Sequence, residues 1–106
     1  MPDAFKIRQL NDDCRTQIDM KAKTLITSGI LALGLEIIAK ATYKMVSFDD
    51  FDEDTPEHDF GTFTIDGQKF FWKIDYYNLT MDGGSPDPSD PEVTQRVLTL
   101  MLAEEY

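Results

Sequence analysis

The chain's only histidine lies in a segment that could carry acid–base chemistry. This segment, Phe48–Gly61 (FDDFDEDTPEHDFG), also holds seven carboxylates and no lysine or arginine. If the strand that begins there pairs with the following strand across a tight turn, His58 lies opposite Asp75. A carboxylate beside an imidazole orients the ring for proton transfer, so this pair is a candidate catalytic dyad. Because no Ser or Cys is placed within reach, the sequence favours an ion pair that pins the two strands together.

The same segment contains the residue types that bind metal ions. Neighbours in an extended chain point to opposite faces, so Glu57, His58 and Asp59 surround one ion only if the backbone there is irregular. Oxygen ligands for Ca²⁺ or Mg²⁺ could come from Asp49, Asp50, Asp52 and Asp54. The run lacks the glycine and the closing glutamate of an EF-hand loop. We therefore expect no metal site and no cofactor.

The charge of the chain is large and unevenly distributed. Twenty acidic and ten basic residues give a net charge of −10. Residues 1–48 hold seven basic and five acidic residues, a net +2, whereas residues 49–106 hold three basic and fifteen acidic residues, a net −12. Such an excess repels phosphates, so direct binding to nucleic acid or to an anionic membrane is disfavoured.

Carboxylates along a loop and a hairpin rim can instead imitate the phosphates of DNA. This interpretation predicts that the protein occupies a basic groove on a nucleic-acid-handling protein. The predicted partner-binding residues are Asp49, Asp50, Asp52, Glu53, Asp54, Glu57, Asp59, Asp66, Asp82 and Asp87. The plainer alternative is an acidic surface that serves only solubility.

Several elements must position these residues. Apolar residues at helical spacing predict a first helix over Ala4–Ile18 and a second from about Leu35, and the β-branched run at 23–29 predicts a short strand between them. Asp66-Gly67 joins two β-rich runs and predicts a type I′ hairpin, with Gly61 opposite Trp72. The side chains expected to face the core are those of Phe63, Ile65, Phe70, Trp72, Ile74 and Tyr76.

A last helix is predicted from Pro91 towards the C-terminus. Asp90 is a suitable capping residue, and proline is favoured at the first helical position. Val93, Val97, Leu100 and Met101 share one face, and two further leucines widen the stripe, so this helix could also form a homodimer contact. An oligomeric structural or interaction module is therefore an alternative function.

The predicted element order is α-β-α-β-β-α. It describes a single α+β domain over residues 1–106, with a small antiparallel sheet of about three strands packed with three helices. The segment MPDAFKIRQLNDDCR has charges throughout and lacks the apolar core of a signal peptide, and no apolar run approaches the roughly 18 to 20 residues of a membrane span. Together with the single cysteine, Cys14, this predicts a cytoplasmic protein.

Four strings in the chain, EHDFG, FWKIDYY, GSPDP and LTLMLAEEY, resemble a family of short bacterial proteins known as domain of unknown function 3768. The resemblance covers Ile7 to Tyr106, although IDMKAK (Ile18–Lys23) departs from the glycine-rich form typical of the family. In its genetic setting the family is similar to genes carried on plasmids and integrated elements, often near antirestriction genes. The family has no established reaction. The resemblance implies a non-enzymatic accessory protein that blunts a host nuclease defence, of the anti-CRISPR or antirestriction type. A small enzyme or ligand-binding domain that uses His58 and Asp75 is the other alternative.

Overall fold

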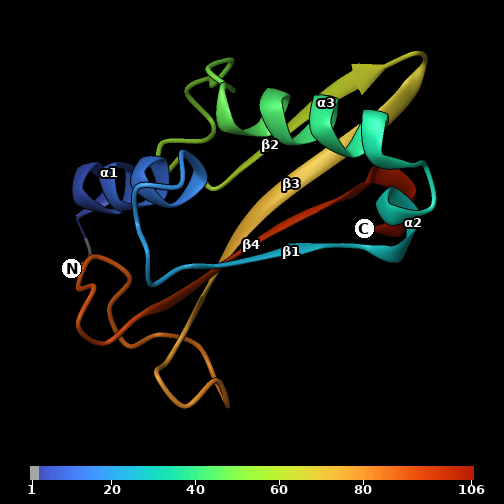
Figure 1. The fold of residues 1–106 in the computed structure, drawn as a ribbon. Helices are drawn as coiled ribbons and strands as arrows, with labels where there is room; N and C mark the ends of the chain where they lie inside the picture. The colour runs from blue at the N-terminus through green and yellow to red at the C-terminus, as the bar shows by residue number, and fades with distance from the viewer. Residues whose placement is uncertain (1–2) are drawn as a thin grey trace.

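Helices cover one face of a four-stranded sheet in the computed structural model, which describes residues 3–106 (Figure 1). The elements, in chain order, are α1 (Ala4–Arg15), β1 (Lys23–Ile26), α2 (Ser28–Leu31), α3 (Leu35–Val46), β2 (Phe60–Ile65), β3 (Gln68–Tyr77), β4 (Gln95–Leu102) and a 3-10 turn, η1 (Ala103–Glu105). The strand order is β1-β4-β3-β2. The predicted α+β class is confirmed. Three helices are present, but only α1 and α3 are among those predicted, so the element order α-β-α-α-β-β-β differs from the predicted one. The sheet has four strands rather than about three, and it is mixed, because β1 is parallel to β4.

The hairpin forms as its turn predicts. Asp66 and Gly67 have φ values of 51° and 81°, as a type I′ turn requires, and Gly61 pairs with Trp72. A Cβ atom added to Gly61 would lie 2.7 Å from Nε1 of Trp72 and 2.6 Å from Cζ of Phe48. Glycine at this position therefore makes room for the two rings.

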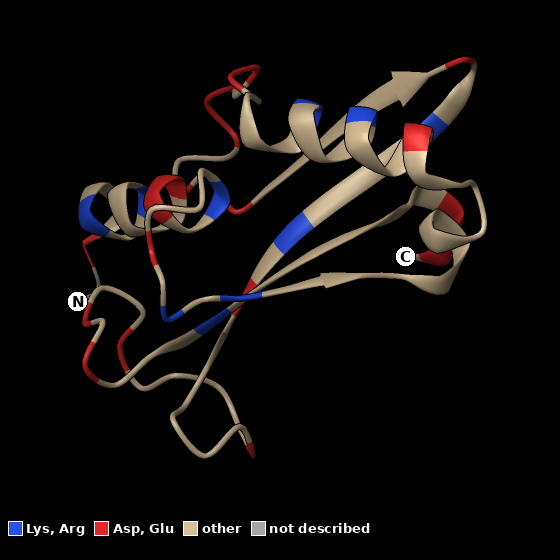
Figure 2. Cartoon of the chain, in the orientation of Figure 1, with Lys and Arg blue, Asp and Glu red and all other residues tan. Residues whose placement is uncertain are grey.

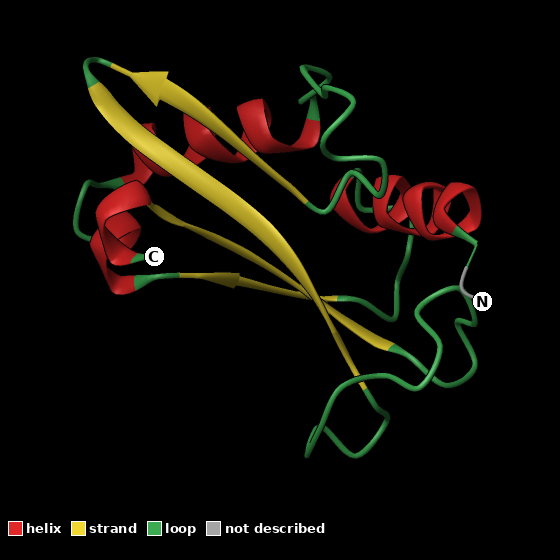
Figure 3. Ribbon diagram, turned by 180° about the vertical axis from the view of Figure 1, so that it is seen from behind, coloured by secondary structure: helices red, strands yellow, loops and turns green. Residues whose placement is uncertain are grey.

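All three helices contribute to one apolar core on one face of the sheet. Alternate residues of the strands point into it, including Phe70, Trp72 and Ile74 of β3, and they meet Cys14, Ile30, Ala41 and Met45 from the helices. The six side chains predicted to face the core all do so. Seen from behind, the other face of the sheet lies in front of the helices (Figure 3). Among the described residues no helix is long and apolar enough to cross a membrane.

Helix α1 ends at Arg15, three residues before the predicted end. Gln17 has φ 69°, and the N–H groups of Gln17 and Ile18 donate to the carbonyls of Cys14 and Asp13. These are the two hydrogen bonds of a Schellman motif, which stops the helix although no glycine is present. Ile18 therefore lies outside the apolar stripe and is 69% exposed.

The predicted last helix is wrong, because this segment forms strand β4 in the middle of the sheet. Asp90 caps a single turn, in which its Oδ1 accepts from the N–H of Glu92 and its carbonyl accepts from the N–H of Val93. From Arg96 to Leu102 both faces of the strand are buried except at Thr99. A short run that is apolar on every side fits a central strand and a buried helix equally well by periodicity. The proposed homodimer contact through a C-terminal helix therefore has no helix to carry it.

Candidate interaction site

Five acidic residues lie together on the connection between α3 and β2. We call residues 49–54 the acidic loop. Phe48 and Phe51 anchor it, with their rings edge to face at 5.0 Å between centroids. Both rings also pack edge-on against Trp72 at the centre of the core, at 5.5 and 6.1 Å. Because one ring is packed just before the acidic loop and the other in its middle, the acidic side chains are displayed from a fixed backbone.

One carboxylate of the acidic loop shapes its backbone, and the other four are free. Oδ1 of Asp52 accepts hydrogen bonds from the N–H of Asp54 at 2.9 Å and the hydroxyl of Thr55 at 3.2 Å. The side chains of Asp49, Asp50, Glu53 and Asp54 are exposed and make no hydrogen bond or ion pair with any residue in 3–106. These four charges are available to an outside cation.

The acidic loop borders a hollow of about 420 Å³. Its lining comprises Phe48, Asp50, Asp52, Asp54, Thr55, Phe60, Gly61 and Thr62. Within residues 3–106 no three His, Cys, Asp or Glu side chains converge closely enough to hold a metal ion. Carboxylates beside aromatic rings suit a larger cation, because a guanidinium or an ammonium can pair with the acids and lie against a ring. The hollow thus matches the side chain of an arginine or a lysine.

The predicted His58/Asp75 dyad is wrong. Pairing of β2 with β3 stops at Phe60 opposite Lys73, and the N–H of Ile74 then donates to the carbonyl of Asp59. His58 has φ 54°, which turns its ring away from β3. Asp75 instead accepts a hydrogen bond from Nζ of Lys73. Register extended past the end of a strand fails once one residue adopts positive φ.

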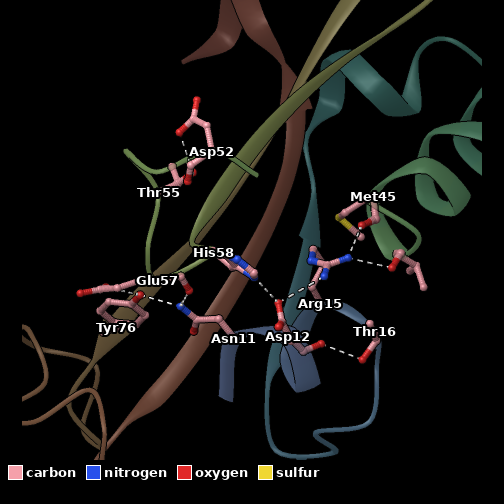
Figure 4. A network of polar contacts seen from close by, with 11 residues as sticks. Asn11, Asp12, Arg15, Thr16, Met45, Asp52, Thr55, Glu57, His58 and Tyr76 are labelled. Carbon is pink, nitrogen blue, oxygen red and sulfur yellow. Dashed lines mark hydrogen bonds and ion pairs between the residues drawn. The ribbon is translucent and has the colours of Figure 1, made fainter. Parts of the chain in front are cut away.

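His58 faces α1. Its Nδ1 lies 2.9 Å from Oδ1 of Asp12 (Figure 4). Its ring stacks on Phe51, with centroids 3.7 Å apart and planes 4° apart. Asp12 thus orients the imidazole as a catalytic carboxylate would, but no Ser, Thr or Cys in residues 3–106 is hydrogen-bonded to the ring. The stacking on Phe51 and the contact with Asp12 fix the end of the segment that follows the acidic loop.

Arg15 links α1 to the C-terminal end of α3. Its Nη1 donates to the carbonyls of Met45 and Val46, at 3.1 and 2.8 Å, and its Nη2 lies 3.3 Å from Oδ1 of Asp12. The guanidinium is buried and also faces the ring of Phe51 at 5.3 Å. Since it pairs with the last carbonyls of α3, it stabilises the end of the helix from which the acidic loop departs.

Asn11 is the centre of a second buried contact. Its Nδ2 donates to the carbonyl of Glu57 at 3.0 Å and to the hydroxyl of Tyr76 at 2.7 Å, and its Oδ1 accepts from Nε of Arg96 at 2.7 Å. The Tyr76 hydroxyl donates in turn to Oε1 of Glu57 at 2.8 Å. Burial raises the pKa of Tyr76, so the phenol stays protonated and keeps this donor. The side-chain amide of Asn11 therefore joins helix α1, the segment before β2, and strands β3 and β4.

Sequence reasoning missed Asn11, Asp12, Arg15, Tyr76 and Arg96 as parts of this site. One signal was present for Asn11, which lies four residues after Ile7 and three before Cys14 on the buried stripe of α1. A polar residue at a core position requires hydrogen-bond partners. The partners of Asn11 lie 46 to 85 residues away in the chain, which local periodicity cannot indicate.

The other predicted partner-binding residues do not extend the acidic loop into one patch. Glu57 and Asp59 are partly buried. Burial raises the pKa of Asp59, and the nearby carboxylates of Glu57 and Asp75 raise it further. The backbone N–H of Asp59 and the side chain of His58 act in the opposite direction. Asp66 lies at the β2–β3 turn, about 30 Å along β3 from the loop that carries Asp82. Figure 2 shows these acidic segments at separate ends of the molecule.

Asp82 and Asp87 shape their own loops. Asp82 accepts from the Thr80 hydroxyl at 2.7 Å and from Nδ2 of Asn78 at 2.8 Å, and these bonds lower its pKa. Asp87 accepts from the hydroxyl and the N–H of Ser89, which lower its pKa in the same way. Their oxygens are thus partly occupied within the chain.

Comparison with known proteins gives a family and no function. The family described as protein of unknown function (DUF3768) matches residues 26–105. That range contains the acidic loop and strands β2, β3 and β4, but only the last residue of β1. It excludes α1, which supplies Asn11, Asp12 and Arg15. No curated protein and no solved structure matches the chain.

Proposed function

This chain belongs to the DUF3768 family, which has no known activity, and we propose a function from its acidic loop. The protein is a non-enzymatic inhibitor that occupies a basic, nucleic-acid-binding groove of another protein. The class of partner is a host nuclease complex of restriction or CRISPR defence, and the place of action is the cytoplasm. The single observation that carries the proposal is the set of four free carboxylates on an anchored loop beside an acidic hollow.

The anchoring makes the binding favourable in physical terms. Flexible acidic tails lose conformational entropy when they bind, whereas the acidic loop is already fixed by Phe48, Phe51 and the Asp52 turn. Five carboxylates within six residues repel one another, and a cationic groove relieves that repulsion. The hollow then receives one lysine or arginine of the partner, which gives the contact a defined register.

Charge alone would make any acidic protein a weak competitor of DNA, so the test compares two variants of equal charge. The loop variant carries Asp49→Asn, Asp50→Asn, Glu53→Gln and Asp54→Asn. The control variant carries Glu36→Gln, Asp66→Asn, Glu92→Gln and Glu104→Gln, four exposed acids that lie outside the acidic loop. Neutralising four acids changes the net charge from −10 to −6 in both.

The assay is inhibition of DNA cleavage by a panel of purified restriction and CRISPR nuclease complexes, at low and at high salt. We expect the wild type to inhibit at least one complex, the control variant to retain that inhibition, and the loop variant to lose it. Added salt should weaken inhibition because it screens the charges. Inhibition of none of the complexes, or equal inhibition by both variants, contradicts the proposal.

A further inference from the structure

A second hollow, separate from the acidic loop, lies between α1 and the start of β4. Its volume is about 370 Å³, which is within the range of small-molecule sites. Its apolar wall is formed by Leu10, Ile18, Met20 and Pro91. Figure 1 shows the segment after α1 descending towards the start of β1, on the side where the chain enters β4. We call this space the α1–β4 hollow.

Arg96 lines the α1–β4 hollow and has no carboxylate partner. The residue is only 3% exposed, and no acidic oxygen of residues 3–106 lies within 4.0 Å of its guanidinium. Its Nε donates to Asn11 and its Nη2 donates to the carbonyl of Pro88. Buried cations are ordinarily paired with an anion, because desolvation of the charge is costly.

The third guanidinium nitrogen faces accessible space. Nη1 of Arg96 makes no hydrogen bond with residues 3–106, and it is not among the fully buried unpartnered nitrogens of that range, which are Nε of Arg15 and Nε1 of Trp72. Arg96 is among the residues that line the α1–β4 hollow. The guanidinium also lies 5.1 Å from the centre of the Tyr76 ring, and Nη1 is its one nitrogen without an acceptor among residues 3–106. An acceptor bound in the α1–β4 hollow would supply that missing hydrogen bond.

The remaining charges around the α1–β4 hollow are of both signs. Asp13 and Asp19 also line it, as does Lys21, so with Arg96 the lining holds two positive and two negative groups. A simple carboxylic acid would satisfy Arg96 but would face two carboxylates. An amine would satisfy those carboxylates but would leave Arg96 unpaired. A ligand that carries both a carboxylate and an ammonium group can pair with Arg96 and with the two carboxylates at the same time.

We propose that the α1–β4 hollow binds an apolar α-amino acid in its zwitterionic form. The carboxylate accepts from Arg96, the ammonium lies against Asp13 and Asp19, and the side chain packs on Leu10, Met20 and Pro91. This site is independent of the acidic loop. Occupancy would rigidify the segment 16–22 and supply the missing anion to the Asn11–Arg96 contact.

Titration of L-leucine into the full chain, followed by backbone amide shifts in two-dimensional NMR, tests this assignment. We expect saturable shifts at residues 18–22 and 94–96. Two probes carry one charge each on the same apolar chain: 4-methylpentanoate and 3-methylbutylamine. Each should bind at least about tenfold more weakly than leucine, since a charge-assisted hydrogen bond contributes a factor of about 10 to 100.

Two exposed positions give a matched pair of variants. Met20→Glu replaces a 91% exposed residue of the wall by an acid and should weaken leucine binding at least about fivefold, because it removes apolar contact. Leu79→Glu makes the equivalent change at a 63% exposed residue on the loop after β3 and should have no effect. Arg96→Lys, if folded, should also weaken binding. No saturable leucine shifts, equal binding by either single-charge probe, or full binding by Met20→Glu overturns the proposal.

Discussion

Replacement of Asn11 by alanine removes the amide that joins α1 to the segment after the acidic loop. The side chain is fully buried and takes part in three hydrogen bonds, to Arg96, Tyr76 and the Glu57 carbonyl. Alanine is a good helix former, so α1 itself should persist. The change therefore isolates the tertiary contribution of the contact.

The expected cost follows from the partners left behind. A hydrogen bond to a charged group contributes about 1.5 to 3 kcal/mol, and a neutral one about 1 kcal/mol. With one charged donor and two neutral groups left without Asn11, the free energy of unfolding should fall by about 3 to 5 kcal/mol. This is a large fraction of the roughly 5 to 15 kcal/mol that stabilises a domain of this kind.

Equilibrium unfolding in urea at pH 7 measures the effect, with tryptophan fluorescence as the signal because Trp72 is buried beside the site. Gln9→Ala is the control, since Gln9 is exposed on the same helix, and it should change the free energy of unfolding by no more than about 0.5 kcal/mol. A loss below about 1 kcal/mol for Asn11→Ala would refute the assignment of this contact as a central support of the site.

Two further changes test the surroundings of the acidic loop by the same urea method. Gly61→Ala should cost about 1 to 3 kcal/mol, because its Cβ would lie 2.6 Å from Phe48 and 2.7 Å from Trp72; unchanged stability would mean that the rings move freely. Asp59→Asn should stabilise the protein at pH 7, because burial raises the pKa of this carboxyl and its ionised form is therefore costly in the fold. That advantage should vanish below the unfolded value of 3.8, where both states are protonated, and Asp66→Asn controls for the equal change in net charge.

The parts of the fold set by local rules could be predicted from the sequence. Asp66-Gly67 determines the turn, the turn determines the register, and the register determines which side of β3 faces the core. The same reasoning failed at β4, because a segment buried on both faces has no periodicity that separates strand from helix.

The acidic loop of the candidate site could be predicted from the sequence, but the buried polar contacts that hold it in place could not. The cluster of acids is visible in the sequence, and its exposure follows from charge. The positive φ of His58 gave no sequence signal and redirected the ring from Asp75 to Asp12. The burial of Arg96 depends on which strand becomes central, so the α1–β4 hollow could not be foreseen either.

Competition with DNA tests the central claim most directly. One nuclease complex that the protein inhibits is titrated with the labelled wild-type chain, at fixed ionic strength, in the presence of increasing concentrations of its DNA substrate. Mimicry of DNA by the acidic loop predicts that the apparent dissociation constant of the protein rises in proportion to the DNA concentration. Undiminished binding to a complex already saturated with DNA would contradict the claim that the acidic loop occupies the nucleic-acid groove.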